Sequence, residues 1–487
     1  MIGNRARRLV VLAVAIACSD EGSLGPAARL ELAAVSGNNQ TGPVGERLVQ
    51  AYAVKVTRDS IPVAGVLVRW EVLTGTGTVA PGSGLTDAAG IAQAFHTLGQ
   101  EPGVQQVRAS LDRAPGAAVT FVATADPLPP PLVSRFPVPA QFGLHDTFVR
   151  DGIAFLSAWN TGIVILDVGA GIRGGAPAAP VEISRIVPTA APLSTPSIHN
   201  AWWFHNPVTS EKRYLLVGQE GPAITGASSS GDIKVLDVSD LAQPREVAFF
   251  HLDEAGTHNF WVDEAAQVLY AAYYNAGVVA LDISGALEGD LRGRLRAVNA
   301  AGGPGNSFVW GVMLADGHLY ASDMLSGFWQ LDPVTLAPVA GGNNVAERFG
   351  SDLWVKGEFA YTGTWGMRLS VLGNAIKVWR LGSTGAPSLA DSVIVDGIRT
   401  VSDLEVSDNG RLLVASAEGA TGAGVLGVLV YSLRDPSKPA LVGRAPVANG
   451  VHTVTLARIG GKLYVFAAGN PPDPALEIYD LSTFDVP

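Results

Sequence analysis

One short strand motif recurs along the second part of the chain, and it limits the fold more than any other feature. Its seven copies are TGIVILDV, SGDIKVLDV, AGVVALDI, SGFWQLDP, NAIKVWRL, GVLVYSL and ALEIYDL. An aspartate holds the same place in five of them: Asp167, Asp237, Asp282, Asp332 and Asp480. Successive copies lie roughly 40 to 60 residues apart, a period typical of propeller blades and solenoids. This part of the chain is therefore predicted to be a repeat protein.

Each repeat unit reads as four short strands. An opening strand, a strand of aromatic and small residues and the motif strand are followed by a segment that begins at proline, such as PVEISRIV, PREVAFF or PALVGRA. Four antiparallel strands in each of seven units predict a seven-bladed β-propeller. A solenoid is the alternative architecture for the same repeats.

The last unit provides three strands and then stops at Pro487. The segment PLVSRFPVP, residues 131–139, is similar to PALVGRAPV, residues 439–447, which supplies a fourth strand in the unit before. We expect this early segment to complete the last blade. Such a strand closes the ring and covers the exposed edges that invite aggregation.

A smaller domain precedes the repeats. Between Arg29 and Asp126, short alternating strands are separated by turn residues at nearly regular spacing, which predicts a β-sandwich. The stretches GVLVRWEVLTGTGTV and TDAAGIAQAFHTLG resemble a bacterial immunoglobulin-like module of the invasin and intimin type. The resemblance implies that Trp70 fills the core between two sheets and that the module acts as a spacer or stalk. The whole chain is thus expected to be all-β, with the sandwich at 26–126, a proline-rich linker at 127–131 and the propeller at 132–487.

The first residues, MIGNRARRLVVLAVAIACSD, have the layout of an export signal, with arginines before a short apolar run. Cys18 is the only cysteine, and Ala-Ile-Ala-Cys resembles a bacterial lipobox. The resemblance implies a lipid on Cys18, a signal and tether at 1–25, and a protein anchored to the outer membrane or cell surface of a Gram-negative bacterium. A plain secretory signal is the alternative.

Charge excludes one class of partner. The formal net charge is −11, and no basic stripe is present, so nucleic acid is not an expected partner. The sequence also lacks a serine nucleophile elbow, a phosphate loop and an EF-hand spacing.

Two motif strands carry a family resemblance. TGIVILDVG and SGDIKVLDVSDLAQP resemble LVIVD repeats, which occur in exported bacterial and archaeal propellers. The resemblance extends over most of residues 130–487. It implies the propeller fold and leaves the function open, because propellers serve as binding modules and as enzymes alike.

The opening strands begin with a recurring polar pair. Its first position holds His145, His199, His258, Trp310, Ser351, Ser402 and His452. Its second position holds Asp146, Asn200, Asn259, Gly311, Asp352, Asp403 and Thr453. The innermost strand of a propeller blade lines the central channel. Because a closed ring makes units one, two, three and seven consecutive, the four histidines are expected to form one arc at the channel.

This arc has two interpretations. The imidazoles of His145, His199, His258 and His452 could bind Zn, Cu or Fe, with Asp146, Asn200 and Asn259 orienting the rings. Alternatively, each histidine packs between blades as a structural residue of the repeat. Trp202 and Trp203, close to His199, also have two possible roles: they line an aromatic pocket, or they pack in the core of a blade.

Two classes of function remain. The first is a membrane-anchored binding protein that displays the propeller on its spacer and recognises a protein or glycan at the propeller face. The alternative is an exported metal-dependent hydrolase or oxidoreductase with a histidine-lined site in the channel. In the second case the chain is loosely similar to selenium-binding-protein-type oxidases, although it lacks their cysteine chemistry. The sequence does not identify catalytic residues.

Overall fold

The structure is a computed structural model of the 487-residue chain, and it describes residues 29–112, 114–139, 142–189, 196–221, 228–421 and 426–485. The chain divides into two compact units, Met1–Asp126 and Pro127–Pro487. Cys18 and the predicted signal and tether lie outside the described residues. Nearly all regular structure in the described part is β-strand. Its helical element is the short 3₁₀ turn Arg292–Arg294, and none of its helices has the length and apolar character to cross a membrane.

The first unit contains two sheets. One sheet has the order β1 (Leu30–Ser36), β3 (Tyr52–Arg58), β8 (Ile91–Thr97) and β6 (Thr78–Ala80), with β4 (Ile61–Pro62) paired to β3. The other has the order β2 (Gln40–Pro43), β10 (Ala114–Asp126), β9 (Gly103–Leu111), β5 (Leu67–Thr74) and β7 (Ser83–Leu85).

Aromatic side chains from both sheets fill the core of this unit. Tyr52 from one sheet stacks on Phe121 from the other at 4.6 Å between ring centroids, and Trp70 lies 5.8 Å from the same phenylalanine. Trp70 therefore occupies the core position that the sequence predicted. His96 is fully buried beside them, and its Nδ1 bonds the Tyr52 hydroxyl at 3.1 Å, so this histidine has a structural role.

In the described part of the second unit, seven sheets have four or five strands each. From the inner strand outward, the first sheet contains β12 (Asp146–Arg150), β13 (Ile153–Ser157), β14 (Ile163–Asp167) and β15 (Val181–Ile186). The second contains β16 (Ile198–Phe204), β17 (Tyr214–Gln219), β18 (Ile233–Asp237), β19 (Arg245–Phe250) and β23 (Gly289–Asp290). The third contains β20 (Phe260–Asp263), β21 (Val268–Ala272), β22 (Val278–Asp282) and β24 (Leu295–Asn299). In the second of them, β23 adds a parallel strand at the outer edge.

The other four sheets follow the same order along the chain. The fourth sheet contains β25 (Val309–Ala315), β26 (His318–Asp323), β27 (Gly327–Leu331) and β28 (Pro338–Gly341), and the fifth contains β29 (Phe349–Lys356), β30 (Phe359–Trp365), β33 (Ala375–Leu381) and β34 (Pro387–Ile394). The sixth contains β35 (Leu404–Val406), β36 (Leu412–Ala417), β37 (Gly427–Ser432) and β38 (Ala440–Pro446). The seventh contains β39 (Val451–Ile459), β40 (Lys462–Gly469), β41 (Ala475–Asp480) and β11 (Leu132–Pro137). A hairpin, β31 (Met367–Arg368) and β32 (Val371–Leu372), lies between two strands of the fifth sheet.

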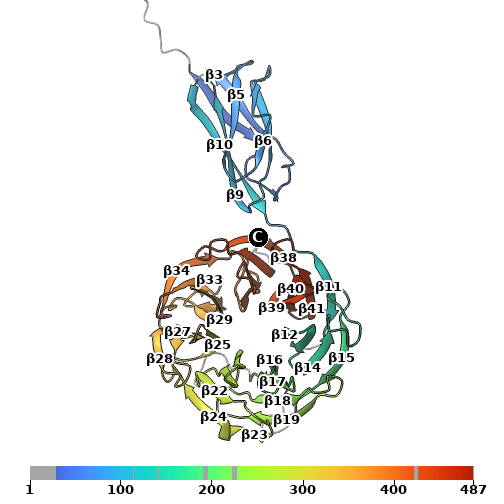
Figure 1. Cartoon of the computed structure of the whole chain (residues 1–487). Helices are drawn as coiled ribbons and strands as arrows, with labels where there is room; N and C mark the ends of the chain where they lie inside the picture. Colours follow the sequence, from blue (N-terminus) through green and yellow to red (C-terminus); the bar gives the residue numbers. More distant parts are fainter. Residues whose placement is uncertain are drawn as a thin grey trace, which may run out of the picture. The chain divides into compact units, whose positions relative to one another are not determined.

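The sheets stand around a central axis as a β-propeller, and Figure 1 shows them as a ring. The last sheet takes its outer strand from the start of the unit, because β11 pairs antiparallel with β41, with Phe136 opposite Leu476. The strand expected within residues 131–139 is therefore present at Leu132–Pro137. Hydrophobic clusters fill the spaces between neighbouring sheets: Phe155 of β13, for example, packs with Trp203 of β16. The predicted all-β propeller is confirmed.

The repeated aspartate shapes the turn after the third strand of a sheet. Asp167 is fully buried, and its carboxylate accepts hydrogen bonds from the backbone N–H of Gly169 and Ala170 at 3.0 and 2.9 Å. The bond to the N–H two residues later is also made by Asp237, Asp282, Asp332 and Asp480. Short acidic side chains favour such turns because they satisfy backbone donors locally. The aspartate of the motif thus recurs because it stabilises the turn after the third strand.

Candidate metal centre

The four histidines predicted to form an arc do come together in the structure. Neighbouring ring centroids lie 4.2 Å apart for His452 and His145, 4.3 Å for His145 and His199, and 3.9 Å for His199 and His258. The rings come from four consecutive sheets, at the start of their inner strands. They meet because β11 closes the ring and makes the last sheet a neighbour of the first.

The backbone fixes the tautomer of His258 at one end of the arc. Its Nδ1 lies 2.7 Å from the carbonyl oxygen of Trp310, whose ring is 4.1 Å from the imidazole. A carbonyl only accepts, so Nδ1 carries the proton and Nε2 of the neutral ring keeps its lone pair. His258 is 2% exposed. Burial, with the nearby His145 and His452, holds its pKa well below the usual value, so the ring stays neutral and could serve as a ligand.

Two ring nitrogens of His199 are buried without a hydrogen-bond partner among the described residues, and so is Nδ1 of His145. His199 is 1% exposed. Burial holds the pKa of both histidines well below the usual value, and the neighbouring histidines lower it further. A buried polar atom without a partner costs roughly 1–3 kcal/mol. A neutral imidazole has one lone pair, so a metal ion could satisfy one of the two His199 nitrogens.

Glu220 is the carboxylate that sequence reasoning missed. Its Oε2 lies 3.7 Å from Nε2 of His145 and 3.9 Å from Nε2 of His199. One ligand atom from each of these three residues lies within 4.8 Å of the others. The hydroxyl of Tyr274 donates to Oε1 of Glu220 and holds the carboxylate in place. Burial raises the pKa of Glu220 to about 7.

The position of Glu220 in the repeat could have identified it from the sequence. It directly follows the second strand β17, and Glu418 directly follows the second strand β36 in the sixth sheet. Both therefore hold one repeat position, at the end of a second strand beside the channel. The histidines, by contrast, share a position at the start of the first strands.

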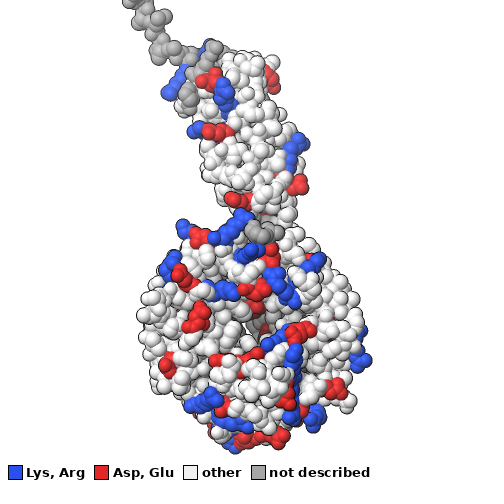
Figure 2. Space-filling view, in the orientation of Figure 1, with Lys and Arg blue, Asp and Glu red and all other residues white. Residues whose placement is uncertain are grey.

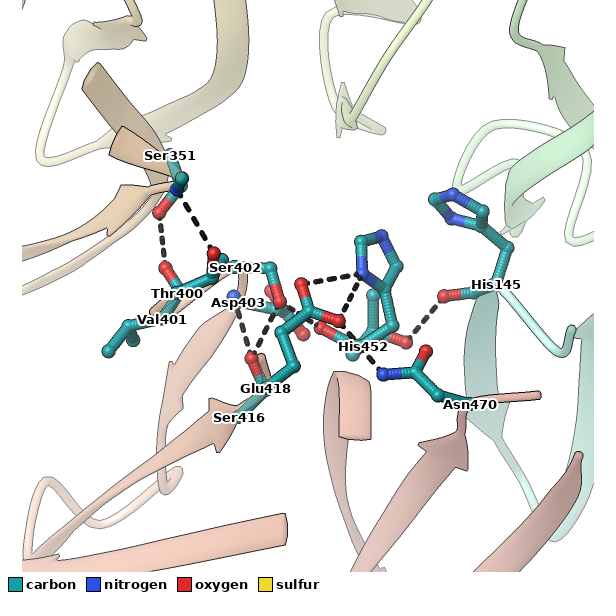
Figure 3. A network of polar contacts seen from close by, with 12 residues as sticks. His145, Ser351, Thr400, Val401, Ser402, Asp403, Ser416, Glu418, His452 and Asn470 are labelled. Atoms are coloured by element: carbon teal, nitrogen blue, oxygen red, sulfur yellow. Dashed lines mark hydrogen bonds and ion pairs between the residues drawn. The ribbon is translucent and has the colours of Figure 1, made fainter. Parts of the chain in front are cut away.

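Glu418 forms an ion pair with the fourth histidine (Figure 3). Nδ1 of His452 lies 3.1 Å from Oε1 of Glu418, and the amide of Asn470 donates to Oε2 of the same carboxylate at 2.9 Å. Burial opposes a charge on His452, but the carboxylates around it, chiefly Glu418, outweigh burial and raise its pKa to about 9. The charge on His452 in turn lowers the pKa of Glu418 against the effect of burial. A protonated imidazole cannot bind a metal, so His452 is the least suited of the four at neutral pH.

The three residues predicted to orient the rings lie one position further along their strands. The amide of Asn259 donates to Oδ1 of Asp352 at 2.8 Å. Asp146 and Asn200 line the channel together with them. Their predicted role toward the histidine rings stays a prediction.

Comparison with known proteins adds one family match. The model of the LVIVD repeat matches residues 348–372, which include β30 of the fifth sheet. No curated protein sequence matches the chain. Together with the sheet topology, the match supports a β-propeller repeat protein.

Two solved structures are similar to the chain. One is the β-propeller domain of Cps50 (Swd1) from Myceliophteria thermophila, with 13% identity, a TM-score of 0.49, and coverage of 72% of this chain and 99% of that chain. The other is the WD40 β-propeller domain of Doa1, with 11% identity, a TM-score of 0.48, and coverage of 71% and 95%.

Proposed function

We propose that the protein binds a transition-metal ion in the propeller channel and uses it as an exported metal-dependent enzyme. The ligands are Nε2 of His145, Nε2 of His199 and the Glu220 carboxylate, with His258 next to them. The observation that supports this most is the pair of buried, unpartnered nitrogens of His199 close to a carboxylate. A metal bound at Nε2 would give one of these two nitrogens its partner.

The donor set favours particular metals and a particular use. Two imidazoles and one carboxylate suit Zn, Fe(II) or Cu, and they leave coordination positions open for water or a substrate. Open positions are typical of catalytic sites, whereas structural zinc is usually enclosed by four protein ligands. A metal held in this way would act as a Lewis acid or redox centre at the channel.

Metal content of the purified full-length protein tests the site. The protein is loaded separately with Zn, Cu and Fe(II) after chelation, passed through a desalting column and measured by mass spectrometry of the elements. We expect about one ion per chain for one of these metals, and loss of that ion in His199→Ala and Glu220→Gln. His318→Ala, a matched histidine change on β26 in the fourth sheet, should retain it. Failure of all three metals to bind stoichiometrically would contradict the proposal.

We also propose that the protein is exported. We propose that the seven sheets are the blades of a closed seven-bladed propeller and that the first unit is a bacterial immunoglobulin-like spacer. A lipid on Cys18 would anchor both to the outer membrane or cell surface, which the membrane fraction of cells expressing Cys18→Ser would test. Recognition of a protein or glycan at the propeller face stays a prediction.

A further inference from the structure

The channel contains a second feature beyond the histidine cluster. A cavity of about 220 Å³ begins at the layer of Asp146 and Asp352 and continues along the inner strands. The space-filling view shows the hollow at the centre of the propeller (Figure 2). We call this cavity the chamber. The residues of the metal centre, His145, His199 and Glu220, are not in its wall.

Four carboxyl groups line the chamber, and the only positive charge that acts on any of them is that of His452, near Asp146 and Asp403, among the described residues. They are Asp146, Asp352, Asp403 and Glu405. Their hydrogen bonds come from neutral donors: Oδ2 of Asp403 accepts from the N–H of Val454 and Oε2 of Glu405 from the N–H of Leu456, both at 2.7 Å. The described lining contains neither lysine nor arginine nor histidine. Burying four carboxyl groups with so little counter-charge is costly, and a cation in the chamber would offset that cost.

Burial also changes the protonation of these groups. It raises the pKa of Asp352 to about 6 and that of Glu405 well above the usual value. Protons therefore lower the charge of an empty chamber. A cation that enters would take their place.

Aromatic rings form another part of the wall. Phe148, Trp202, Trp261 and Trp354 occupy the same position on their inner strands, three residues after the leading residue of each. Neighbouring centroids lie 5.2 Å apart for Phe148 and Trp202, 5.4 Å for Trp202 and Trp261, and 6.1 Å for Trp261 and Trp354. Glu405 holds this same position in the sixth sheet. One layer of the chamber thus combines an arc of four rings with a carboxylate.

Unpaired polar atoms in the wall point independently to a ligand. Oγ1 of Thr147 and Oδ1 of Asn200 have no hydrogen-bond partner among the described residues, and the two side chains are 2% and 3% exposed. The indole N–H of Trp202 is also unpartnered. Buried polar groups normally have partners, and these three belong to residues that line the chamber.

We infer that the chamber binds a small organic cation of the alkylammonium class. The faces of Trp202, Trp261 and Trp354 would cover its alkyl groups through cation–π contacts, and Glu405 would balance its charge. A hydrated inorganic ion would satisfy the carboxylates but would make no use of the rings. An apolar cavity of about 150 Å³ holds benzene, so the chamber has room for a cation of choline's size.

Calorimetric titration of the full-length protein tests the charge requirement. Choline, tetramethylammonium and trimethylamine are compared with 3,3-dimethyl-1-butanol, the uncharged isostere of choline. We expect at least one of the cations to bind with an affinity about tenfold or more above that of the isostere. Equal affinities, or no binding of any cation at millimolar concentration, would overturn the inference. Tighter binding of Ca²⁺ that displaces choline would overturn it too.

Two variants locate the binding in the chamber. Glu405→Gln and Trp261→Leu should each weaken binding of the cation about tenfold, because one removes the charge and the other an aromatic face. Glu358→Gln, a change of a carboxylate that is 80% exposed, should leave the affinity unchanged. Glu405→Gln removes a carboxylate from a repulsive cluster, so its melting temperature should not fall, and loss of binding is then not loss of fold. Unchanged affinity in both variants would contradict the assignment.

This inference goes beyond the proposed metal function and fails separately from it. His199→Ala should lose the metal and keep the cation site, since His199 does not line the chamber. Glu405→Gln should lose the cation site and keep the metal. If His199→Ala abolished both in a folded protein, the two sites would be one, and the separate chamber would be refuted.

Discussion

Four histidines from four neighbouring sheets meet beside the channel, and the carboxylates of Glu220 and Glu418 lie next to them. His145, His199, His258 and His452 stand at one position of a repeat, so alignment of the opening strands was enough to predict that they meet. Glu220 and Glu418 lie at strand ends that vary from unit to unit, and their approach to the rings depends on the curvature of the ring of sheets. The unpaired nitrogens of His199 could be found only in the structure.

The charge of His452 gives a prediction at this scale. The Glu418 carboxylate raises the pKa of His452 to about 9 although burial opposes the charge. In chelator-treated protein, NMR titration of the His452 ring should therefore show a midpoint near 9. Glu418→Gln removes the carboxylate that raises this pKa most, so the midpoint should fall.

The raised pKa of His452 also determines how the stability of the protein changes with pH. Because the pKa of His452 is higher in the folded than in the unfolded chain, its contribution is complete below the unfolded value, about 6.5, and is lost as the pH rises through about 9. The melting temperature of the unaltered protein should fall over this window more than that of Glu418→Gln. Parallel curves for the two proteins would contradict the ion pair.

At the scale of strands and turns, the repeat was predictable where the backbone itself requires particular residues. The motif aspartates close turns, and the apolar strand before them is buried between sheets, so both recur in sequence. The extra strand β23 and the hairpin β31–β32 could not be predicted, because they have no counterpart in the other units. The chamber could not be predicted either. Its aromatic layer combines rings from four sheets, and the sequence does not show that these rings meet.

Replacement of a motif aspartate should destabilise its sheet. Oδ1 of Asp282 accepts from the N–H of Ser284 at 2.8 Å, and Oδ2 pairs with Arg296 at 2.8 Å. Asp282→Ala removes both contacts and should lower the free energy of unfolding by about 1–3 kcal/mol, measured by urea denaturation. Asp396→Ala, an exposed aspartate, is the control and should change it by less than about 0.5 kcal/mol. Equal effects of the two changes would show that the turn bonds contribute nothing.

At the scale of the whole molecule, the arc of histidines depends on closure of the ring. The sequence allowed this prediction because the segment before the first unit is similar to the fourth strand of another unit. Closure is what makes His452, near the end of the chain, a neighbour of His145. Without β11, the outer edge of the last sheet would expose the unpaired backbone of β41.

A pair of truncated proteins measures this dependence. One begins at residue 127 and keeps β11, and the other begins at residue 139 and lacks it. Val133 and Phe136 of β11 pack against the core between the last and first sheets, and Arg135 pairs with Asp473 at 2.7 Å. The shorter protein loses these contacts and gains an open edge strand, so it should melt at a lower temperature and self-associate, as measured by calorimetry and by light scattering after size exclusion. The longer protein should self-associate no more than the full-length protein does. The twelve residues that separate the two proteins leave every ligand of the proposed metal site in place, so weaker metal binding by the shorter protein would show that closure holds the histidines together. If the two proteins melted at the same temperature and bound metal equally, the strand would be dispensable and the explanation of the arc by ring closure would fail.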